Sequence, residues 1–336
     1  MLHHGGVHSN LDFDSLGKRA GFLDVTHSDD RHAFSTIKVP AGVIHGGNGA
    51  TLLLTAGSHG DEYEGQIILR KLMQELQPDA VNGRIIILPA FNMPAVMARS
   101  RISPIDQGNM NRSFPGDVGQ GPTDEVAAFV TTHLIPQADV IVDFHSGGTA
   151  TQYVDCGFTC RGPNAELNRR NWELANVFGA PFTMLCDIDG TGGDFDTTAH
   201  NLNTAFLACE LGGLGRFSQS SFQFGWAGLH QVMGHLGIIA KRPPAPATRF
   251  IAVNDSATHI TSTNYGLAEF HVLLGDNVRK GDPVVTLYDM HNLQFEPIVM
   301  PATQNGVIAV VRRNPLVEPG DHLCLIAPEI SQPTIA

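Results

Sequence analysis

The sequence predicts an α/β protein with a mostly parallel sheet flanked by helices and a small C-terminal β domain. Apolar β-rich runs alternate with amphipathic segments through the first two thirds of the chain. After about residue 242 this pattern gives way to short β-like pieces separated by Gly/Asp turns. The 336 residues are also many for a single compact domain, which favours one large domain with a smaller appendage.

The large domain is predicted from strand-like runs and one clear helix. EGQIILRKLMQEL at 64–76 places apolar residues at positions 67, 68, 69, 72, 73 and 76, which fit one helical stripe. The residues before it, GSHGDEYEGQ at 57–66, therefore connect a strand to a helix. Near-continuous apolar runs are typical of strands that are covered on both faces, and they occur at 51–56, 84–90, 138–146 and 204–213.

The boundary between the domains is predicted at KRPPAPATR (241–249), which carries three prolines and reads as a linker. We therefore expect a large domain over 1–242 and a small β domain over 250–330. In the latter, GDNVRKGDPVVTL (275–287) and PGDHLCLI (319–326) resemble the paired half-motifs of a barrel-sandwich hybrid. No modified lysine in an exposed hairpin accompanies them, so we infer this architecture without its usual cofactor.

Composition narrows the classes of function. The formal net charge of -12 gives no attraction to nucleic acid or to anionic lipid. The N-terminus MLHHGGVHSN lacks the features of a secretory signal, so we expect a cytoplasmic protein. The five scattered cysteines do not suggest a disulfide framework. Parallel-sheet enzymes of this size often self-associate, so a homo-oligomer is an open expectation.

Polar residues follow several of the predicted strands at their carboxyl ends, where ligands collect in open α/β sheets. His59 and Glu62 follow the run at 51–56, His145 closes 139–144, and Glu210 closes 204–209. His59, Glu62 and His145 would supply two imidazoles and a carboxylate, which leaves a fourth position open, as catalytic zinc requires. Read in isolation, H-x-x-E also fits a solvated histidine and a first-turn carboxylate favoured by the helix dipole.

Arginines and an asparagine lie in the polar loop RISPIDQGNMNRSFPG (101–116). Arginine suits bidentate binding of a carboxylate, although a surface arginine in a polar loop is the simpler alternative. Together HGDE (59–62), the pair Asn111 and Arg112, DFHSGG (143–148) and CELGG (209–213) resemble the succinylglutamate desuccinylase/aspartoacylase family. The resemblance spans residues 50–240 and implies a zinc carboxypeptidase-like, mixed but mostly parallel sheet.

The resemblance implies a role for each matching residue. His59, Glu62 and His145 match the zinc ligands, and Glu210 matches the general base. Asn111 and Arg112 match the pair that binds the substrate carboxylate. Arg101 matches the arginine that polarises the scissile carbonyl, with Arg99 as a competitor because the separation from Arg112 is longer than expected. The implied reaction is hydrolysis of an N-acyl amino acid to a carboxylate and an amine.

Within the family, SPIDQGNMNRSFPG together with HGDEYEG and DFHSGG resembles the N-acetyl-diaminobutyrate deacetylases of ectoine breakdown. A cationic group on the substrate would suit one of four nearby aspartates, which are Asp187, Asp189, Asp194 and Asp196. The simpler alternative for each is a solvated carboxylate in an acidic loop. The alternatives are an N-acylaspartate or succinylglutamate deacylase and a peptide-cutting metallocarboxypeptidase. A non-enzymatic metal-binding module is disfavoured, because neither Glu210 nor Arg112 is needed to hold zinc.

Overall fold

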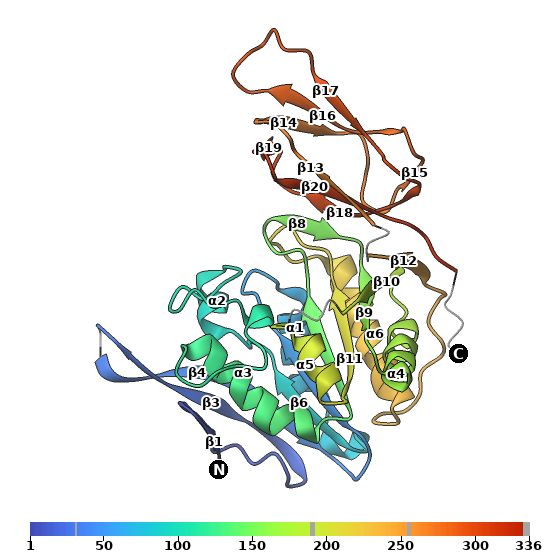
Figure 1. Cartoon of the computed structure of the whole chain (residues 1–336). Helices are drawn as coiled ribbons and strands as arrows, with labels where there is room; N and C mark the ends of the chain where they lie inside the picture. The colour runs from blue at the N-terminus through green and yellow to red at the C-terminus, as the bar shows by residue number, and fades with distance from the viewer. Residues whose placement is uncertain (31, 189–191, 254–256, 332–336) are drawn as a thin grey trace.

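The computed structural model describes residues 1–336 except 31, 189–191, 254–256 and 332–336. Its main body is built on one large sheet (Figure 1), in the order β1-β2-β3-β4-β6-β5-β7-β11-β9-β10-β12. In that order the strands are Leu2–His4, Val7–Ser9, Gly17–Asp29, His32–His45, Arg84–Leu88, Thr51–Ala56, Val140–His145, Ala205–Glu210, Cys156–Arg161, Phe182–Asp187 and Arg249–Ala252.

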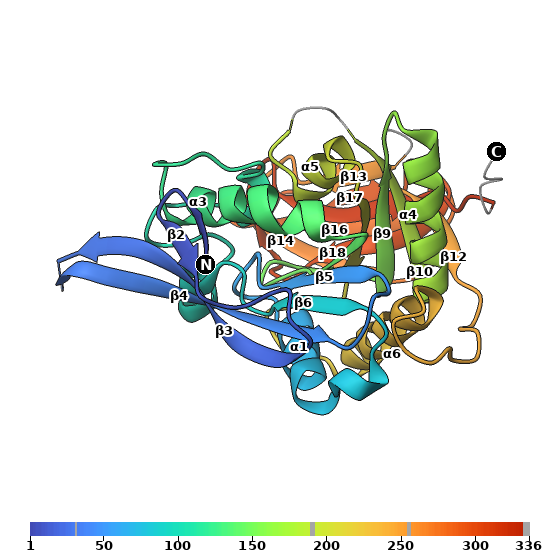
Figure 2. The ribbon, with the colours of Figure 1, turned by 90° about the horizontal axis from the view of Figure 1, so that it is seen from below.

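The predicted α/β class is confirmed, and the sheet is mixed. Pairing is parallel from β6 through β5 and β7 to β11, and again from β9 through β10 to β12. The pairing is antiparallel between β11 and β9 and from β1 through to β6. Strands β3 and β4 form a long hairpin that extends away from the body (Figure 2).

Helices cover both faces of the large sheet (Figure 2). One face packs against α1 (Glu64–Glu75), α4 (Ala165–Phe178) and α6 (Gln219–His235) through a core of residues such as Ile68, Leu174 and Leu229. The other face packs against α3 (Pro122–Phe129) and α5 (Phe195–Asn201). The short helix α2 (Met93–Ala98) follows β6. No helix in the described part of the chain combines the length and apolar character needed to cross a bilayer.

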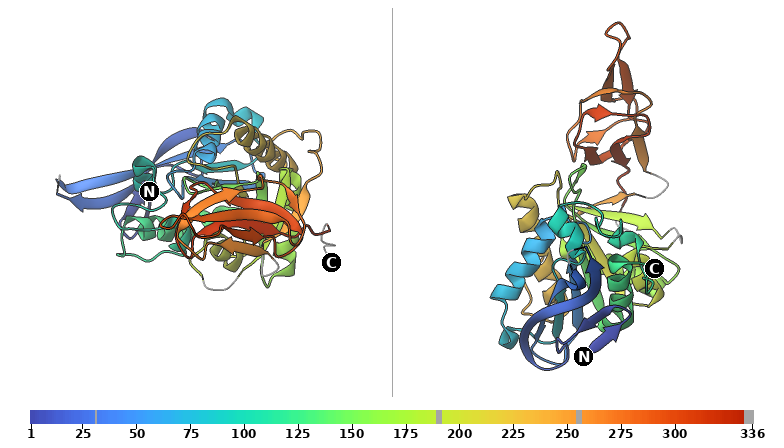
Figure 3. Two further views of the ribbon diagram at one scale, coloured as in Figure 1. Left: turned by 90° about the horizontal axis from the view of Figure 1, so that it is seen from above. Right: turned by 90° about the vertical axis from the view of Figure 1, so that its left-hand side faces the viewer.

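The C-terminal strands form a separate β lobe that stands on the main body (Figure 3). It consists of two antiparallel sheets, in agreement with the sequence prediction. One sheet contains β13 (Thr258–Thr261), β20 (His322–Ala327), β18 (Gly306–Arg312) and β15 (Asn277–Val278). The other contains β17 (Ile298–Pro301), β16 (Pro283–Asp289), β14 (Gly266–Phe270) and β19 (Leu316–Val317).

Two connections join this lobe to the body. Strand β12 follows the proline-rich segment but pairs with β10 in the large sheet. Strand β8 (Thr151–Tyr153) leaves the body and pairs with β18 of the lobe, with Tyr153 opposite Val310. The division at 242 and 250 stays a prediction, and the chain after it still contributes one strand to the large sheet.

Candidate active site

The turn after β5 is shaped by two glycines. Gly57 has a φ of +72°, a conformation that L side chains rarely adopt. Gly60 packs against α2 so closely that a Cβ at this position would lie 1.9 Å from the carbonyl oxygen of Ala95. The turn therefore approaches α2 at a distance that only glycine permits. This backbone path brings both His59 and Glu62, three residues apart, into the buried interior.

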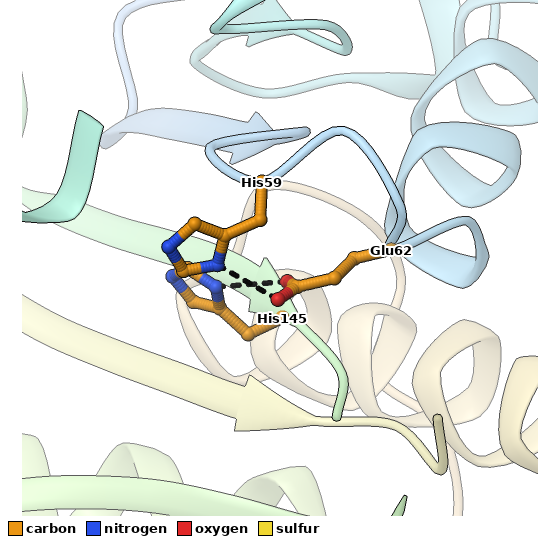
Figure 4. Close-up of side chains that lie close together, drawn as sticks. All are labelled: His59, Glu62 and His145. Atoms are coloured by element: carbon orange, nitrogen blue, oxygen red, sulfur yellow. Dashed lines mark hydrogen bonds and ion pairs between the residues drawn. The ribbon is translucent and has the colours of Figure 1, made fainter. Parts of the chain in front are cut away.

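His59, Glu62 and His145 converge at the carboxyl ends of β5 and β7 (Figure 4). Glu62 Oε1 lies 2.7 Å from His59 Nδ1, and Glu62 Oε2 lies 3.0 Å from His145 Nδ1. One donor atom from each residue falls within 4.8 Å of the others. The three residues predicted as metal ligands therefore form one buried group that could hold a metal ion.

The far nitrogens of the two imidazoles have partners of their own. His145 Nε2 lies 2.8 Å from Asp143 Oδ2, and Asp143 Oδ1 accepts a 2.7 Å hydrogen bond from Thr55 Oγ1. His59 Nε2 lies 3.1 Å from the side-chain oxygen of Asn109. Both partners are acceptors, so each Nε2 carries the proton and each Nδ1 is directed at Glu62. A metal ligand histidine is commonly held in this way.

The electrostatics of the group also fit a cation. Burial alone would raise the pKa of Glu62, but His145 and His59 outweigh it and lower the pKa to about 2. Glu62 is thus ionised, and a cation placed between its carboxylate and the two Nδ1 atoms would lie next to a negative charge. Two imidazoles and one carboxylate are the ligands of a catalytic zinc site with an open position.

Glu210 ends β11 directly beside His145, its partner in the parallel register. Its side chain lines the same cavity, and Oε2 is buried without a hydrogen-bond partner among the described residues. Burial raises the pKa of Glu210 to about 8, and the charge of Glu62 adds to the effect. A buried carboxyl with a free oxygen and a raised pKa is suited to accept and return a proton near neutral pH.

The structure distinguishes the two candidate arginines by position. Arg101 lines the cavity and places Nη1 3.4 Å from His59 Nδ1. Arg99 is the exposed C-cap of α2 and does not line the cavity. Asn111 and Arg112 also line the cavity, and Arg112 Nη1 lies 2.5 Å from Asp194 Oδ1. The Arg112 side chain is 58% exposed, so it lies toward the mouth of the site.

These groups surround one cavity of about 320 Å³, large enough for a small molecule. Among the four aspartates singled out in the sequence, Asp187, Asp194 and Asp196 line it. Asp189 lies outside the described residues. Two hydrogen bonds join the loop that carries Asp194 to the Asn111 loop. The side-chain oxygen of Asn111 accepts a 3.2 Å hydrogen bond from the Phe195 amide, and the Phe114 amide donates to the carbonyl oxygen of Gly193.

Comparison with known proteins identifies the family of this chain. Residues 48–236 match the model of the succinylglutamate desuccinylase/aspartoacylase catalytic domain. The chain belongs to the succinylglutamate desuccinylase/aspartoacylase family. This range contains His59, Glu62, His145 and Glu210. Because the family hydrolyses amides, the protein is a deacylase-type hydrolase acting on linear amides.

Members similar to this chain along its whole length include a curated protein and solved structures. The N-alpha-acetyl-L-2,4-diaminobutyric acid deacetylase of Halomonas elongata is 36% identical over 324 residues, which is 96% of this chain and 94% of that protein. A succinylglutamate desuccinylase from a Silicibacter species matches with a TM-score of 0.93 and 31% identity, covering 98% of this chain and 100% of that one. The product-bound ectoine utilization protein EutE (DoeB) of Ruegeria pomeroyi gives 0.93 and 32%, covering 97% and 99%.

One expectation about this family member was wrong. The cysteines did not suggest a disulfide framework, yet Cys160 and Cys186 form a disulfide. They lie directly opposite each other on the parallel strands β9 and β10, 26 residues apart in the chain. Their pairing depends on the register of two strands joined through α4, which cysteine spacing does not reveal. Both residues line the cavity.

Sequence reasoning also missed residues that support the site. Asp143 precedes His145 by two positions on β7, so both side chains project from the same face of the strand. The string VDFH therefore contained a signal for this pair. Asn109 lies in a loop fifty residues from His59, and no periodicity connects them. Tyr153 and Thr151 reach the cavity from β8, the strand that pairs with the C-terminal lobe.

Proposed function

We propose that the protein is a zinc-dependent deacetylase of N-acetyl-L-2,4-diaminobutyrate, acting in the breakdown of ectoine. The observation that carries the reaction class is the buried group of His59, Glu62 and His145 with Glu210 beside it in one cavity. The full-length similarity to the Halomonas elongata deacetylase supports the substrate. The similarity to EutE (DoeB) supports the metabolic setting.

The chain would hold zinc through His59 Nδ1, His145 Nδ1 and the Glu62 carboxylate. Zinc supplies Lewis-acid chemistry and makes water more acidic when it is bound in such a site. Asp143 and Asn109 hold the imidazoles with Nδ1 directed inward, through the contacts to the two Nε2 atoms. The residues thus arrange the ligands before substrate arrives.

Glu210 would move the proton. It removes a proton from the attacking water, whose oxygen adds to the acetyl carbon, and it delivers that proton to the nitrogen as the carbon–nitrogen bond breaks. The products are acetate and the free amino acid. Arg101 would donate hydrogen bonds to the carbonyl oxygen as negative charge develops there, a contribution of the kind whose loss typically costs about 100- to 1000-fold in turnover.

Asn111 and Arg112 would bind the α-carboxylate of the substrate. Arg112 already contacts Asp194, so an incoming carboxylate would share this guanidinium with Asp194. Its exposed position toward the mouth lets the guanidinium contact the substrate while the acetyl group lies deeper, near Glu210.

The alternatives are an N-acylaspartate or succinylglutamate deacylase and a peptide-cutting metallocarboxypeptidase. All three would use the same metal group, so the site alone does not separate them. A panel of N-acetyl-L-2,4-diaminobutyrate, N-acetyl-L-aspartate, N-succinyl-L-glutamate and short peptides does. We expect turnover of the first to exceed that of the others.

The decisive experiment measures acetate released from N-acetyl-L-2,4-diaminobutyrate by the purified protein, before and after chelation and after zinc is restored. Activity that is lost with the metal, regained with zinc and absent from Glu210→Ala at equal zinc content supports the proposal. One zinc per chain without acetate release would reject the substrate and leave the metal site in place.

The proposal includes a cytoplasmic enzyme that contacts neither nucleic acid nor membrane, because its substrate is a small metabolite. In a reducing compartment the Cys160–Cys186 pair would be exposed to cellular thiols. Thiol labelling in intact cells shows whether this pair is reduced, and so tests whether the protein resides in such a compartment. Self-association stays an expectation, which light scattering of the purified protein tests.

A further inference from the structure

Among the described residues six carboxylates line the cavity, and five of them already have a partner or a role. Glu62 contacts both histidines, and Asp143 contacts His145 and Thr55. Glu210 is the proposed base. The remaining three lie at the end of β10 and at the start of α5: Asp187, Asp194 and Asp196.

Two of those three aspartates are neutralised by arginines. Asp187 Oδ1 accepts a 2.8 Å hydrogen bond from Arg161 Nε, and both side chains are at least 40% exposed. Asp194 contacts Arg112 at 2.5 Å. An ammonium group arriving at either aspartate would have to compete with a guanidinium that is already in place.

Asp196 differs from both. It is the second residue of α5, and its Oδ1 accepts a 2.8 Å hydrogen bond from the Thr197 amide. Within the described part of the chain it makes no ion pair with lysine, arginine or histidine. Its side chain is half-buried in the cavity wall, and burial together with the charges of Asp194 and Asp143 raises its pKa to about 6. A carboxylate placed in this way is stabilised by a cation from outside the chain.

We propose that Asp196 is the specificity residue that binds the side-chain ammonium of the substrate. This inference rests on the proposed function, since it assigns a partner to the second amino group of diaminobutyrate. The Asn111 side chain caps the amide of Phe195, and Arg112 contacts Asp194. The group that binds the α-carboxylate is thus tied to the first turn of α5. Carboxylate and ammonium of one short substrate can therefore be bound side by side.

The test compares N-acetyl-L-2,4-diaminobutyrate with N-acetyl-L-norvaline, in which a methyl group replaces the ammonium at nearly the same volume. The neutral compound is measured as a substrate and as a competitive inhibitor, so a selectivity ratio is obtained even where its turnover is slow. The variants are Asp196→Asn, Asp196→Glu and, as the matched carboxylate in the same cavity, Asp187→Asn. Zinc content and thermal unfolding are measured for each.

We expect Asp196→Asn to lower kcat/KM for the charged substrate by about 10- to 100-fold, the loss typical for one charge-assisted hydrogen bond. Its values for the neutral compound should stay near those of the wild type. Asp196→Glu should retain part of the selectivity, and Asp187→Asn all of it.

Equal losses on both compounds, or a loss of selectivity in Asp187→Asn instead, would overturn the assignment of Asp196 while the proposed function stands. A wild-type protein that does not hydrolyse N-acetyl-L-2,4-diaminobutyrate at all, with zinc bound, would overturn the proposed function and the ammonium site with it.

Discussion

Replacing both Cys160 and Cys186 with serine should destabilise the protein markedly. The disulfide closes a loop with a sequence separation of 26. A cross-link of that length removes about 12 cal/mol/K of entropy from the unfolded chain, which corresponds to about 3.5 kcal/mol of unfolding free energy near 25 °C. Because the closed loop runs from the end of β9 through α4 to the end of β10, the effect should appear in the large sheet.

Urea unfolding followed by tryptophan fluorescence measures this loss. Trp172 lies on α4 inside the loop and stacks on Phe250 with ring centroids 4.8 Å apart, whereas Trp226 lies on α6 outside it. Reduced wild type should unfold like the double variant, and reductant should not affect the variant. If the oxidised wild type and the double variant have the same unfolding free energy, the loop-closure reasoning is refuted. Circular dichroism checks that both probes report one transition.

Three further predictions concern the cavity. Asp143→Asn should weaken zinc binding by about 10- to 100-fold, because it removes the carboxylate that holds His145 Nε2, and competition with a coloured chelator measures this. Glu210→Gln should lower kcat by about 100- to 10,000-fold at unchanged zinc content, because proton transfer is lost; turnover near that of the wild type would remove Glu210 from the mechanism. The pKa of Asp196 is raised to about 6 from its ordinary value, so between these values the folded protein keeps a proton that the unfolded chain releases. The unfolding free energy of the wild type should therefore fall as pH rises from about 4 to about 6. Asp196→Asn should lack this fall, and urea unfolding at a series of pH values shows whether the two curves separate in that window.

All three residues of the candidate metal site were predictable because they follow local patterns. His59 and Glu62 follow an apolar run, and His145 ends another, so the strands themselves could be located. In the structure β5 and β7 are adjacent and parallel, with Ala56 opposite Phe144. Parallel neighbours bring their carboxyl ends to the same edge, which is why residues more than eighty positions apart meet there.

The missed features depend on register between distant segments. Cys160 meets Cys186 only through the pairing of β9 with β10. The strand β8 joins the lobe by pairing with β18, more than 150 positions later in the chain, with Tyr153 opposite Val310. The strands β3 and β4 were not predicted, because they lack the near-continuous apolar runs that mark buried strands. Most of their side chains are partly or fully exposed. Such contacts are set by tertiary packing rather than by the spacing of residues along the chain.

The charges of the cavity also bear on which acyl amino acid the site admits. Substrates such as N-acetylaspartate and N-succinylglutamate carry at least two carboxylates, so a second cationic subsite beyond Arg112 would be needed to bind them. Arg101 contacts the metal group and would act on the carbonyl. The remaining cavity wall near α5 presents Asp194 and Asp196, where a second carboxylate would meet like charge. A substrate with one carboxylate and one ammonium avoids this repulsion, since Arg112 and Asp196 would each neutralise one of its charges. The arrangement of charge therefore favours the diaminobutyrate derivative over substrates that carry two or three carboxylates.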